Sequence, residues 1–381
     1  MNNNRMLMAV FNPIEFDGRV KRSASTLALK FDLVVLCPKY GCSAWFKKQI
    51  KYQIRSVRLL NLRFQAIKQL FFWFNLIFIA IRLKPKVIYA HDYYLIFPAW
   101  IASKIIGALV VYDAHELIVL EDGGQATYRD LFFYKLERAL IGKMDLVIAA
   151  NDERSLIMNE HYGLKKIPTV IKNIPPNKEI LMGREYVLRK YNKLKHLNKD
   201  DIHILYMGGV DVNRGISMLL ESLRFLSHNY ICIIIGDGPS MREIGIRYKH
   251  YIENGRLRML GNIINEEIPA LLKEGDIGFI SYAMSGLNNI NCASNKVYEY
   301  AQAQLPIVST AQPPISQILK EYDIGELLPI SGDNMPIQVA NSIKKIKIKG
   351  YYSSGIAKFL DKNKWEYEEI KLLNAINSLK L

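Results

Sequence analysis

The chain has few cysteines, and their spacing excludes two kinds of small domain. Only four of the 381 residues are cysteine, and no two of them form the CxxC pair of a zinc or redox site: Cys37, Cys42, Cys232 and Cys292. A disulfide-rich secreted scaffold is excluded, because four such thiols are typical of a reduced compartment. Residues 1–11 also lack the apolar run of a signal peptide. We expect a cytoplasmic protein.

Acidic residues are missing from a long stretch of the first half. No Asp or Glu occurs between Asp32 and Asp92, and residues 1–104 hold 17 Lys and Arg against 4 Asp and Glu. The basic residues concentrated there are Lys47, Lys48, Lys51, Arg55, Arg58, Arg63 and Lys68. Such a patch attracts polyanions. Since no nucleic-acid-binding module accompanies it, an anionic membrane surface is favoured over nucleic acid.

No apolar run is long enough to span a bilayer. Residues 70–81 (LFFWFNLIFIAI) are apolar except for Asn75, but a spanning helix needs about 20 residues. Two interpretations stay open: a helix buried on one side against a sheet, and a helix that also rests in the lipid interface, where Trp73 and the phenylalanines would suit it. The second predicts a protein held at the inner face of the membrane through residues 47–81.

Length and pattern predict two α/β domains. Half of the residues are apolar, and a chain of 381 residues is longer than one ordinary domain. Short β-branched runs alternate with helical patterns, which is typical of parallel sheets covered by helices. The predicted strands are 6–11, 33–36, 87–90, 109–112, 146–149 and 169–171 in the first half, and 202–207, 230–235, 257–260, 277–281 and 306–309 in the second.

The sequence thus predicts two Rossmann-like domains in tandem. A polar, lysine-rich linker after Pro175 and Pro176 separates them. We expect an N-terminal domain (1–180), a C-terminal domain (181–363) and a C-terminal helix (364–381) that packs back towards the N-terminal domain. The active site is expected in a cleft between the domains.

The segment 288–310 (NNINCASNKVYEYAQAQLPIVST) carries the strongest chemical signal. A polar loop enters a helix whose first amides, at Ser294, Asn295, Lys296 and Val297, can hold phosphate, and Lys296 adds a formal charge. Glu299 follows at a place where a carboxylate could accept hydrogen bonds from a ribose diol. The alternative is that Glu299 only balances the helix dipole.

This segment resembles the PNKLFEYMAAGLPVV element of family 4 glycosyltransferases, which are retaining enzymes of the GT-B fold, and in particular those that act in surface polysaccharide biosynthesis. The resemblance implies that the N-terminal domain binds the acceptor and the C-terminal domain binds the nucleotide-sugar donor. Other similar segments follow the family's order: 16–27 (FDGRVKRSASTL), 87–102 (VIYAHDYYLIFPAWIA), 110–117 (VVYDAHEL), 136–151, 172–175 (KNIP), 206–220 (YMGGVDVNRGISMLL), 235–239 (IGDGP) and 259–263 (MLGNI). The resemblance implies that Glu299 binds the nucleotide ribose. The family's glutamate that contacts the donor sugar falls on Asn291, so the sugar stays open.

The resemblance also assigns the loop 208–215. It implies that Arg214 binds the leaving diphosphate, while Gly209 stands where the family has a second basic residue. A structural turn with a surface arginine is the alternative. By the same resemblance, Asn262 and Ile263 meet the base through backbone groups.

In the first domain, polar residues follow two predicted strands, at the edge where open α/β sheets bind ligands. These are His91 with Asp92, and His115 with Glu116. A histidine that braces the sheet is the alternative for His91, and the absence of a third ligand argues against a metal site. The resemblance places His115 near the transferring sugar.

Four residues of the first domain are assigned to the acceptor: Asp17, Arg19, Asp92 and Glu116. For Asp17 and Arg19, which follow the first predicted strand, an ion pair that caps the helix beginning near Gly18 is an equal alternative.

The predicted reaction is metal-independent, retaining glycosyl transfer from a UDP-, GDP- or ADP-sugar, with no cofactor. His115, Arg214 and Lys296 would be catalytic, with the two cations and the helix amides stabilising the departing diphosphate. The basic first domain favours a lipid-linked saccharide as acceptor, and a soluble saccharide stays open. The alternatives are a non-hydrolysing UDP-sugar epimerase, which needs acid and base groups, and an inactive scaffold of the same fold.

Overall fold

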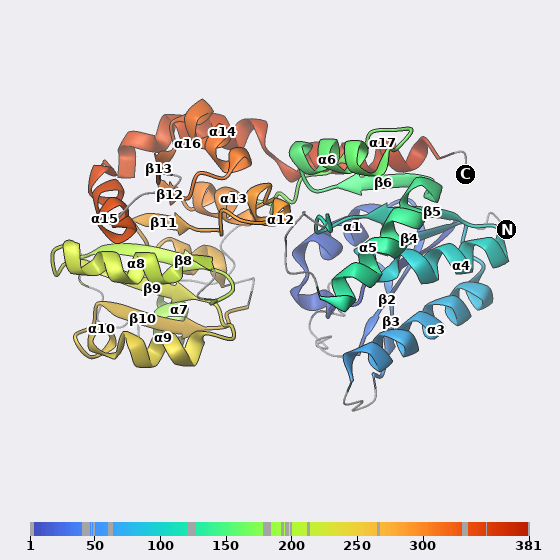
Figure 1. Ribbon diagram of the computed structural model, residues 1–381, viewed down its shortest axis with the longest axis horizontal. Coiled ribbons are helices and arrows are strands. Elements are labelled where there is room, and N and C mark those ends of the chain that lie inside the picture. The colour runs from blue at the N-terminus through green and yellow to red at the C-terminus, as the bar shows by residue number, and fades with distance from the viewer. Residues whose placement is uncertain are drawn as a thin grey trace. The chain divides into compact units, whose positions relative to one another are not determined.

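The computed structural model describes residues 4–39, 46, 48, 50–59, 64–119, 127–177, 184–191, 194, 198, 200–211, 214–264, 267–329, 334–347 and 349–379. The chain divides into two compact units. Unit 1 comprises Met1–Asn173 and Glu366–Leu381, and unit 2 comprises Ile174–Trp365. Each unit is built on its own parallel sheet (Figure 1). The cleft expected between the two predicted domains stays a prediction.

Unit 1 contains a seven-stranded parallel sheet in the order β3-β2-β1-β4-β5-β6-β7. The strands are β1 (Arg5–Ala9), β2 (Asp32–Pro38), β3 (Gln53–Val57), β4 (Val87–His91), β5 (Leu109–Asp113), β6 (Leu146–Ala149) and β7 (Thr169–Val170). The central strands are buried on both faces, as continuous apolar runs predict. The strand order reverses between β1 and β4, so the carboxyl ends of these strands mark the place where such sheets bind ligands.

The described helices of unit 1 are α1 (Gly18–Leu27), α3 (Gln65–Leu83), α4 (Ile96–Ile106), α5 (Tyr128–Leu140), α6 (Asp152–Tyr162) and α17 (Trp365–Asn377), with short 3₁₀ turns at Ile14–Phe16, Tyr93–Leu95 and Ile141–Lys143. Hydrogen bonds hold α17 to this unit. Thr26 Oγ1 donates to Glu369 Oε1 at 2.8 Å, and the Lys172 amide donates to Glu368 Oε2 at 2.7 Å. The last residues of the chain therefore belong to the same fold as the first.

Helix α3 packs on the sheet through one face only. Phe72, Leu76 and Ala80 are fully buried in a core cluster that also contains Leu7 and Ile88 of the sheet. The structure thus confirms the sequence interpretation of a helix buried on one side.

Unit 2 contains a six-stranded parallel sheet in the order β10-β9-β8-β11-β12-β13. The strands are β8 (Ile202–Met207), β9 (Tyr230–Ile235), β10 (Leu257–Gly261), β11 (Ile277–Ile280), β12 (Ile307–Ser309) and β13 (Gly325–Leu327). The order reverses between β8 and β11, which sets the ligand-binding edge of this sheet at their carboxyl ends.

The described helices of unit 2 are α7 (Arg184–Lys190), α8 (Ile216–Ser222), α9 (Met241–Arg247), α10 (Lys249–Glu253), α11 (Ile268–Leu272), α12 (Leu287–Ile290), α13 (Asn295–Gln302), α14 (Pro313–Tyr322), α15 (Met335–Lys345) and α16 (Ser353–Lys362), with 3₁₀ turns at Leu223–Phe225 and Lys349–Tyr352. Tyr300 fastens α13 to the sheet: its hydroxyl donates to the Leu205 carbonyl at 3.0 Å and accepts from the Met207 amide at 3.1 Å. Helix α13 is thereby fixed to β8.

Candidate functional site

In unit 2, the first turn of α13 presents a buried lysine at the edge where the strand order reverses. The helix begins after Ser294, whose side chain makes no capping hydrogen bond to the first amides. Lys296 is only 8% exposed, and its Nζ has no hydrogen-bond partner among the described residues. It lies 5.4 Å from the ring centroid of Tyr206 in β8 and 4.9 Å from that of Tyr282, just after β11. The aromatic rings replace only part of the lost hydration.

The charges around Lys296 call for an anion. Burial and, to a smaller extent, the guanidinium of Arg214 together lower the pKa of Lys296 to about 8, against the opposing effects of Cys292 and of Glu299 one turn along α13. Two cations therefore lie near the amide end of a helix. A desolvated ammonium is costly unless it is paired, and free helix amides attract phosphate. The arrangement is suited to a phosphate or diphosphate.

Glycine lets the loop after β8 approach this lysine. Gly208 has a φ of +126°, and a Cβ there would lie 2.9 Å from Lys296 Cε and 3.1 Å from its Nζ. The IGDGP turn supports the loop from behind, because a Cβ on Gly236 would lie 2.0 Å from the Gly208 carbonyl oxygen. At Gly209 a Cβ would keep an ordinary distance of 3.5 Å from Arg214 Nη1. The close approach therefore depends on Gly208 and Gly236.

The remaining donor residues of the sequence prediction are placed less directly. Ser294 Oγ accepts from Tyr282 Oη at 3.2 Å, and Asn291, at the end of α12, donates from Nδ2 to the Leu287 carbonyl at 3.0 Å. Val297 is 1% exposed, so only its backbone faces the helix end. Asn295 Oδ1 is buried and has no hydrogen-bond partner among the described residues.

The loop that carries Asn262 and Ile263 follows β10, two strands away from β8. A backbone hydrogen bond of 2.9 Å from Gly236 to Gly261 joins its beginning to the IGDGP turn. The sheet thus connects this loop to the Lys296 region, although no described contact brings Asn262 or Ile263 to Lys296 itself.

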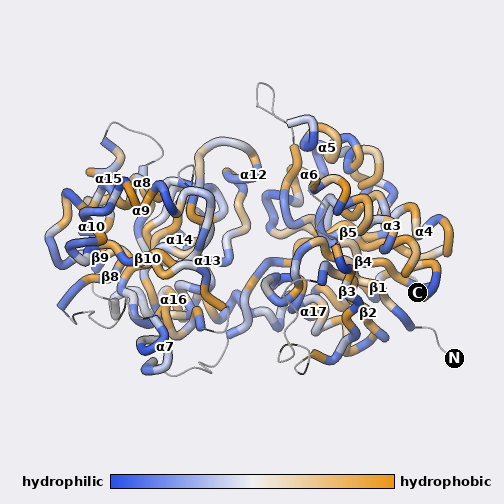
Figure 2. The backbone as a smooth tube through the Cα atoms, turned by 90° about the horizontal axis from the view of Figure 1, so that it is seen from below, coloured by the Kyte–Doolittle hydropathy of each residue, from blue (hydrophilic) through white to orange (hydrophobic). Residues whose placement is uncertain are grey.

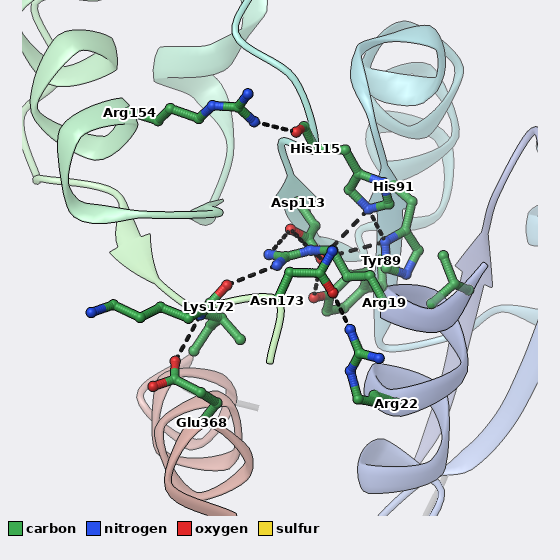
Figure 3. A network of polar contacts seen from close by, with 12 residues as sticks. Arg19, Arg22, Tyr89, His91, Asp113, His115, Arg154, Lys172, Asn173 and Glu368 are labelled. Atoms are coloured by element: carbon green, nitrogen blue, oxygen red, sulfur yellow. Dashed lines mark hydrogen bonds and ion pairs between the residues drawn. The ribbon is translucent and has the colours of Figure 1, made fainter. Parts of the chain in front are cut away.

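In unit 1 the polar centre is a carboxylate that the sequence reasoning did not single out. Asp113, at the end of β5, accepts hydrogen bonds from Arg19 Nε at 3.1 Å, Arg19 Nη2 at 2.6 Å and Tyr89 Oη at 3.0 Å (Figure 3). Arg19 Nη1 also donates to the Ile171 carbonyl at 2.7 Å. Burial would raise the pKa of Asp113, but Arg19 and the two neighbouring histidines outweigh it and hold that pKa well below 3.8.

The two histidines predicted at the sheet edge contact each other. His91 Nδ1 lies 2.9 Å from His115 Nε2 and 3.4 Å from Asp113 Oδ2 (Figure 3). Burial lowers the pKa of His115 to about 4, so the ring is neutral at pH 7. A hydrogen on His91 Nδ1 satisfies both neighbours, which assigns the acceptor role to His115 Nε2 and leaves its Nδ1 as a donor. The contacts of His91 fit both interpretations of this residue, a histidine that braces the sheet and a polar group of the site, and do not choose between them.

Asp113 also corrects the argument that no third metal ligand is present. Ligand atoms of His91, Asp113 and His115 all lie within 4.8 Å of one another. However, Arg19 already forks onto the carboxylate and places a fixed positive charge beside it. A divalent cation would meet that charge, and the carboxylate has few lone pairs left. The arrangement fits a hydrogen-bond network centred on the Arg19–Asp113 pair better than a metal site.

The proposed acceptor residues have separate places in unit 1. Asp17 caps α1, accepting from the Val20 amide at 3.1 Å, which confirms the capping part of the alternative interpretation. The ion-pair part is wrong, because the buried guanidinium of Arg19 pairs with Asp113. Asp92 has a φ of +66° and accepts from the Tyr93 amide at 3.0 Å. Burial, followed by the charge of Glu116, raises the pKa of Asp92 well above 3.8. Such a backbone conformation is uncommon outside functional sites.

Sequence comparison assigns part of the chain to a family. Residues 201–346 match the family model described as glycosyl transferases group 1. The matched residues lie within unit 2. No curated protein matches the chain in sequence.

Solved structures resemble the whole chain. Anabaena Alr3699/HepE in complex with UDP-glucose is 15% identical with a TM-score of 0.74, covering 98% of this chain and 100% of that one. WaaG, a glycosyltransferase involved in lipopolysaccharide biosynthesis, is 15% identical with a TM-score of 0.73, covering 99% and 100%. Sucrose-phosphate synthase from Thermosynechococcus elongatus is 14% identical with a TM-score of 0.75, covering 98% of each chain. These likenesses establish the α/β architecture of GT-B glycosyltransferases.

Proposed function

We propose that the protein transfers a glycosyl group from a nucleoside diphosphate sugar to a saccharide or lipid-linked acceptor, with retention and without a metal ion. The observation that carries the proposal is Lys296, a buried ammonium without a hydrogen-bond partner among the described residues, held beside Arg214 at the amide end of α13. A diphosphate would satisfy both cations and the helix amides. The group 1 match over residues 201–346 and the UDP-glucose complex of HepE support this donor class.

In the proposed reaction the bond between the anomeric carbon and the diphosphate oxygen breaks, and its electron pair stays with that oxygen. The acceptor hydroxyl forms the new bond on the same face of the sugar, and its proton passes to the leaving phosphate. Lys296, Arg214 and the first amides of α13 stabilise the charge on the diphosphate, which removes the need for Mg²⁺. Glu299 accepts hydrogen bonds from the ribose hydroxyls.

Residues of unit 1 would serve the sugar hydroxyls. His115 is neutral at pH 7 and, in the tautomer that the His91 contact favours, offers an N–H from Nδ1. Asp17, Asp92 and Glu116 remain the residues that we propose as ligands of the acceptor. Arg19 would act on the acceptor only through Asp113, because its guanidinium is already bonded to that carboxylate and to the Ile171 carbonyl.

Titration calorimetry with UDP, GDP and ADP and their glucose conjugates tests the donor assignment. We expect one nucleotide series to bind, and Glu299→Ala to weaken the nucleotide by about tenfold through loss of the ribose bonds. The exposed Glu253→Ala in the same unit is the matched control and should change nothing. Wild-type affinity in Glu299→Ala would remove that residue from the ribose site, and no binding of any series would favour an inactive scaffold.

Product analysis tests the chemistry. With the donor found and a saccharide or lipid-linked acceptor, we expect retention of the anomeric configuration by proton NMR and undiminished turnover in EDTA. Arg214→Ala should lower kcat more than donor affinity, because its charge acts mainly on the departing diphosphate. Incubation without acceptor separates the epimerase alternative, since isomerised intact donor would support an epimerase and contradict the transferase.

A further inference from the structure

We propose that the outward face of α3, together with the basic residues that flank it, binds the surface of an anionic lipid bilayer. The helix lies beside α4 on unit 1 (Figure 1), and much of the tube through both helices is hydrophobic (Figure 2). This inference concerns a surface of unit 1 and does not depend on the proposed transferase reaction.

The apolar residues on this face are exposed although the opposite face is packed in the core. The exposed fractions of seven side chains lie between 37% and 71%, and we call these residues the α3 outer face: Phe64, Ile67, Leu70, Phe71, Phe74, Phe78 and Ile81. A helix on the surface of a water-soluble domain normally has a polar outer side. Contiguous exposed apolar residues of this size mark a surface that contacts something other than water.

The α3 outer face is a continuous stripe. With about 100° of rotation per residue, the seven positions fall within an arc of about 120°. Phe64, Ile67, Phe71, Phe74 and Phe78 follow each other at the three- and four-residue spacing of one helix side. Four of the seven are phenylalanines, a residue that interfacial helices use to enter the acyl boundary. The stripe has the width and composition of a helix that lies in the plane of a membrane.

Charge complementarity decides the occupant. The only charged residues within α3 are Lys68 near its beginning and Arg82 near its end, and Lys84 and Lys86 follow. No acidic residue occurs from 33 to 91, so no negative charge in this part of the sequence offsets them. Lys48, Lys51, Arg55 and Arg58 belong to the same stretch, while Lys47 and Arg63 lie outside the described residues. Cations at both ends of an apolar stripe match anionic headgroups above acyl chains.

The helix should lie in the interface rather than cross the bilayer. The structure corrects the expectation that this segment is too short to span a bilayer: α3 (Gln65–Leu83) extends beyond residues 70–81 and is long and apolar enough by length and composition alone. Of its apolar window, 28% is buried within the protein. However, Phe72, Leu76 and Ala80 are 0% exposed and pack against the sheet. Crossing would remove these side chains from the core of unit 1. An in-plane position uses the outer face and leaves the core intact.

A second copy of the chain is a poorer occupant. Pairing two outer faces would bring two basic flanks together without an acidic residue between 33 and 91 on either copy, and such repulsion costs affinity. A bilayer with anionic lipid supplies apolar contact and negative charge at once.

Vesicle sedimentation of the full chain tests the proposal. The probe is large unilamellar vesicles of phosphatidylcholine with about one third phosphatidylglycerol, compared with pure phosphatidylcholine. The test variant is Phe74→Gln with Phe78→Gln, at positions 71% and 61% exposed. The matched control is Ile246→Gln with Leu156→Gln, at positions 68% and 60% exposed on α9 and α6. All four side chains are outside the core, so thermal melts should match wild type.

We expect wild type and control to bind the anionic vesicles, and the Phe74/Phe78 variant to bind at least about tenfold more weakly. Lys68→Gln and Arg82→Gln should each weaken binding about fivefold, and salt should weaken wild-type binding.

Three results would overturn the proposal. Absence of binding to anionic vesicles would do so, as would equal losses in the phenylalanine variant and its control. Ultracentrifugation that shows a dimer lost only in the Phe74/Phe78 variant would assign the outer face to a second copy of the chain.

Discussion

The two units hold their buried charges in opposite ways. In unit 1, the carboxylate of Asp113 is paired with Arg19 and accepts a hydrogen bond from Tyr89, and His91 lies beside it, although the buried Nε2 of His91 has no hydrogen-bond partner among the described residues. In unit 2, Lys296 is also buried, but its Nζ has no hydrogen-bond partner among the described residues. The guanidinium of Arg214 places a second positive charge near it. The paired carboxylate of unit 1 stabilises the fold and orients the side chains around it. The two cations of unit 2 destabilise the fold until an anion binds to them. The comparison supports our proposal that the anion of the donor binds in unit 2, at Lys296 and Arg214.

Breaking the ion pair of Arg19 and Asp113 should have the largest effect on the stability of the protein. Arg19→Met leaves Asp113 buried without its guanidinium, and we expect a loss of about 3–5 kcal/mol in the free energy of unfolding. Urea denaturation followed by circular dichroism measures it. The exposed pair of Arg5 and Asp32, at 2.7 Å, provides the control, since Arg5→Met should cost under about 1 kcal/mol. Similar small losses in both variants would show that the network is not what stabilises unit 1.

Removing the open charge should have the opposite effect on stability. The pKa of Lys296 is lowered from 10.5 to about 8, so the charged form destabilises the fold by about 3 kcal/mol below pH 8, and this cost is relieved as the pH rises towards 10.5. Lys296→Met should therefore raise the melting temperature by several degrees. It should also weaken nucleotide binding at least thirtyfold, or about 2 kcal/mol.

Lys273→Met, an exposed position in unit 2, is the control for this variant and should change neither quantity. A lower melting temperature together with unchanged affinity in Lys296→Met would contradict the description of an open charge that awaits an anion.

Gly208 and Gly209, adjacent in the loop after β8, differ in how much space a side chain would have. A methyl group on Gly208 would meet Lys296 Cε at 2.9 Å and require an unfavourable φ, so Gly208→Ala should cost about 2 kcal/mol in stability and weaken nucleotide binding. Gly209→Ala, with ordinary clearance to Arg214, should cost under about 0.5 kcal/mol. Denaturation and calorimetry of the pair measure both effects. Equal behaviour of the two variants would remove the close approach of Gly208 from the site.

The smallest effect is a pH dependence of donor binding. A diphosphate raises the pKa of Lys296 above its free value of about 8, so affinity should be constant below pH 8 and fall as the pH rises through it. Between pH 7 and pH 9 we expect a decrease of about tenfold for a nucleotide sugar, whose diphosphate does not titrate there. Lys296→Arg should bind without this decrease, because guanidinium stays charged. The same slope in both proteins would assign the titration to another group.

Sequence reasoning predicted the features that are local in the chain. Eleven of the strands in the two sheets begin and end close to predicted apolar runs, while β3 (QIRSV) and β13 (GEL) were missed because these edge strands are short and largely polar or half-buried. The role of Lys296 as a phosphate ligand could be proposed from the sequence because the polar loop before α13 indicates where this helix begins. The isolation of Lys296 from hydrogen-bond partners could not, since that depends on the aromatic rings of other strands.

Asp113 shows why the rest was missed. The residue lies within the segment 110–117 that resembles the family, but its partner Arg19 is 94 positions earlier in the chain. Nothing in the spacing indicates that the two meet, and Arg19 was accordingly assigned to the acceptor. The position of the carboxylate at the end of a buried strand, directly before His115, was the available signal. Long-range ion pairs become visible only when the topology brings strand ends together.

Tyr300 limits how this protein can diverge from its relatives. Its hydroxyl joins α13 to backbone groups of Leu205 and Met207, and a Cβ on Gly278 would lie 2.4 Å from its ring. Lys296 and Glu299, on the same helix, cannot change their spacing or rotation without breaking these buried contacts. We therefore expect variation of the proposed donor site at positions outside these contacts, such as Asn291 and Gly209, where the sequence departs from the family pattern that it resembles.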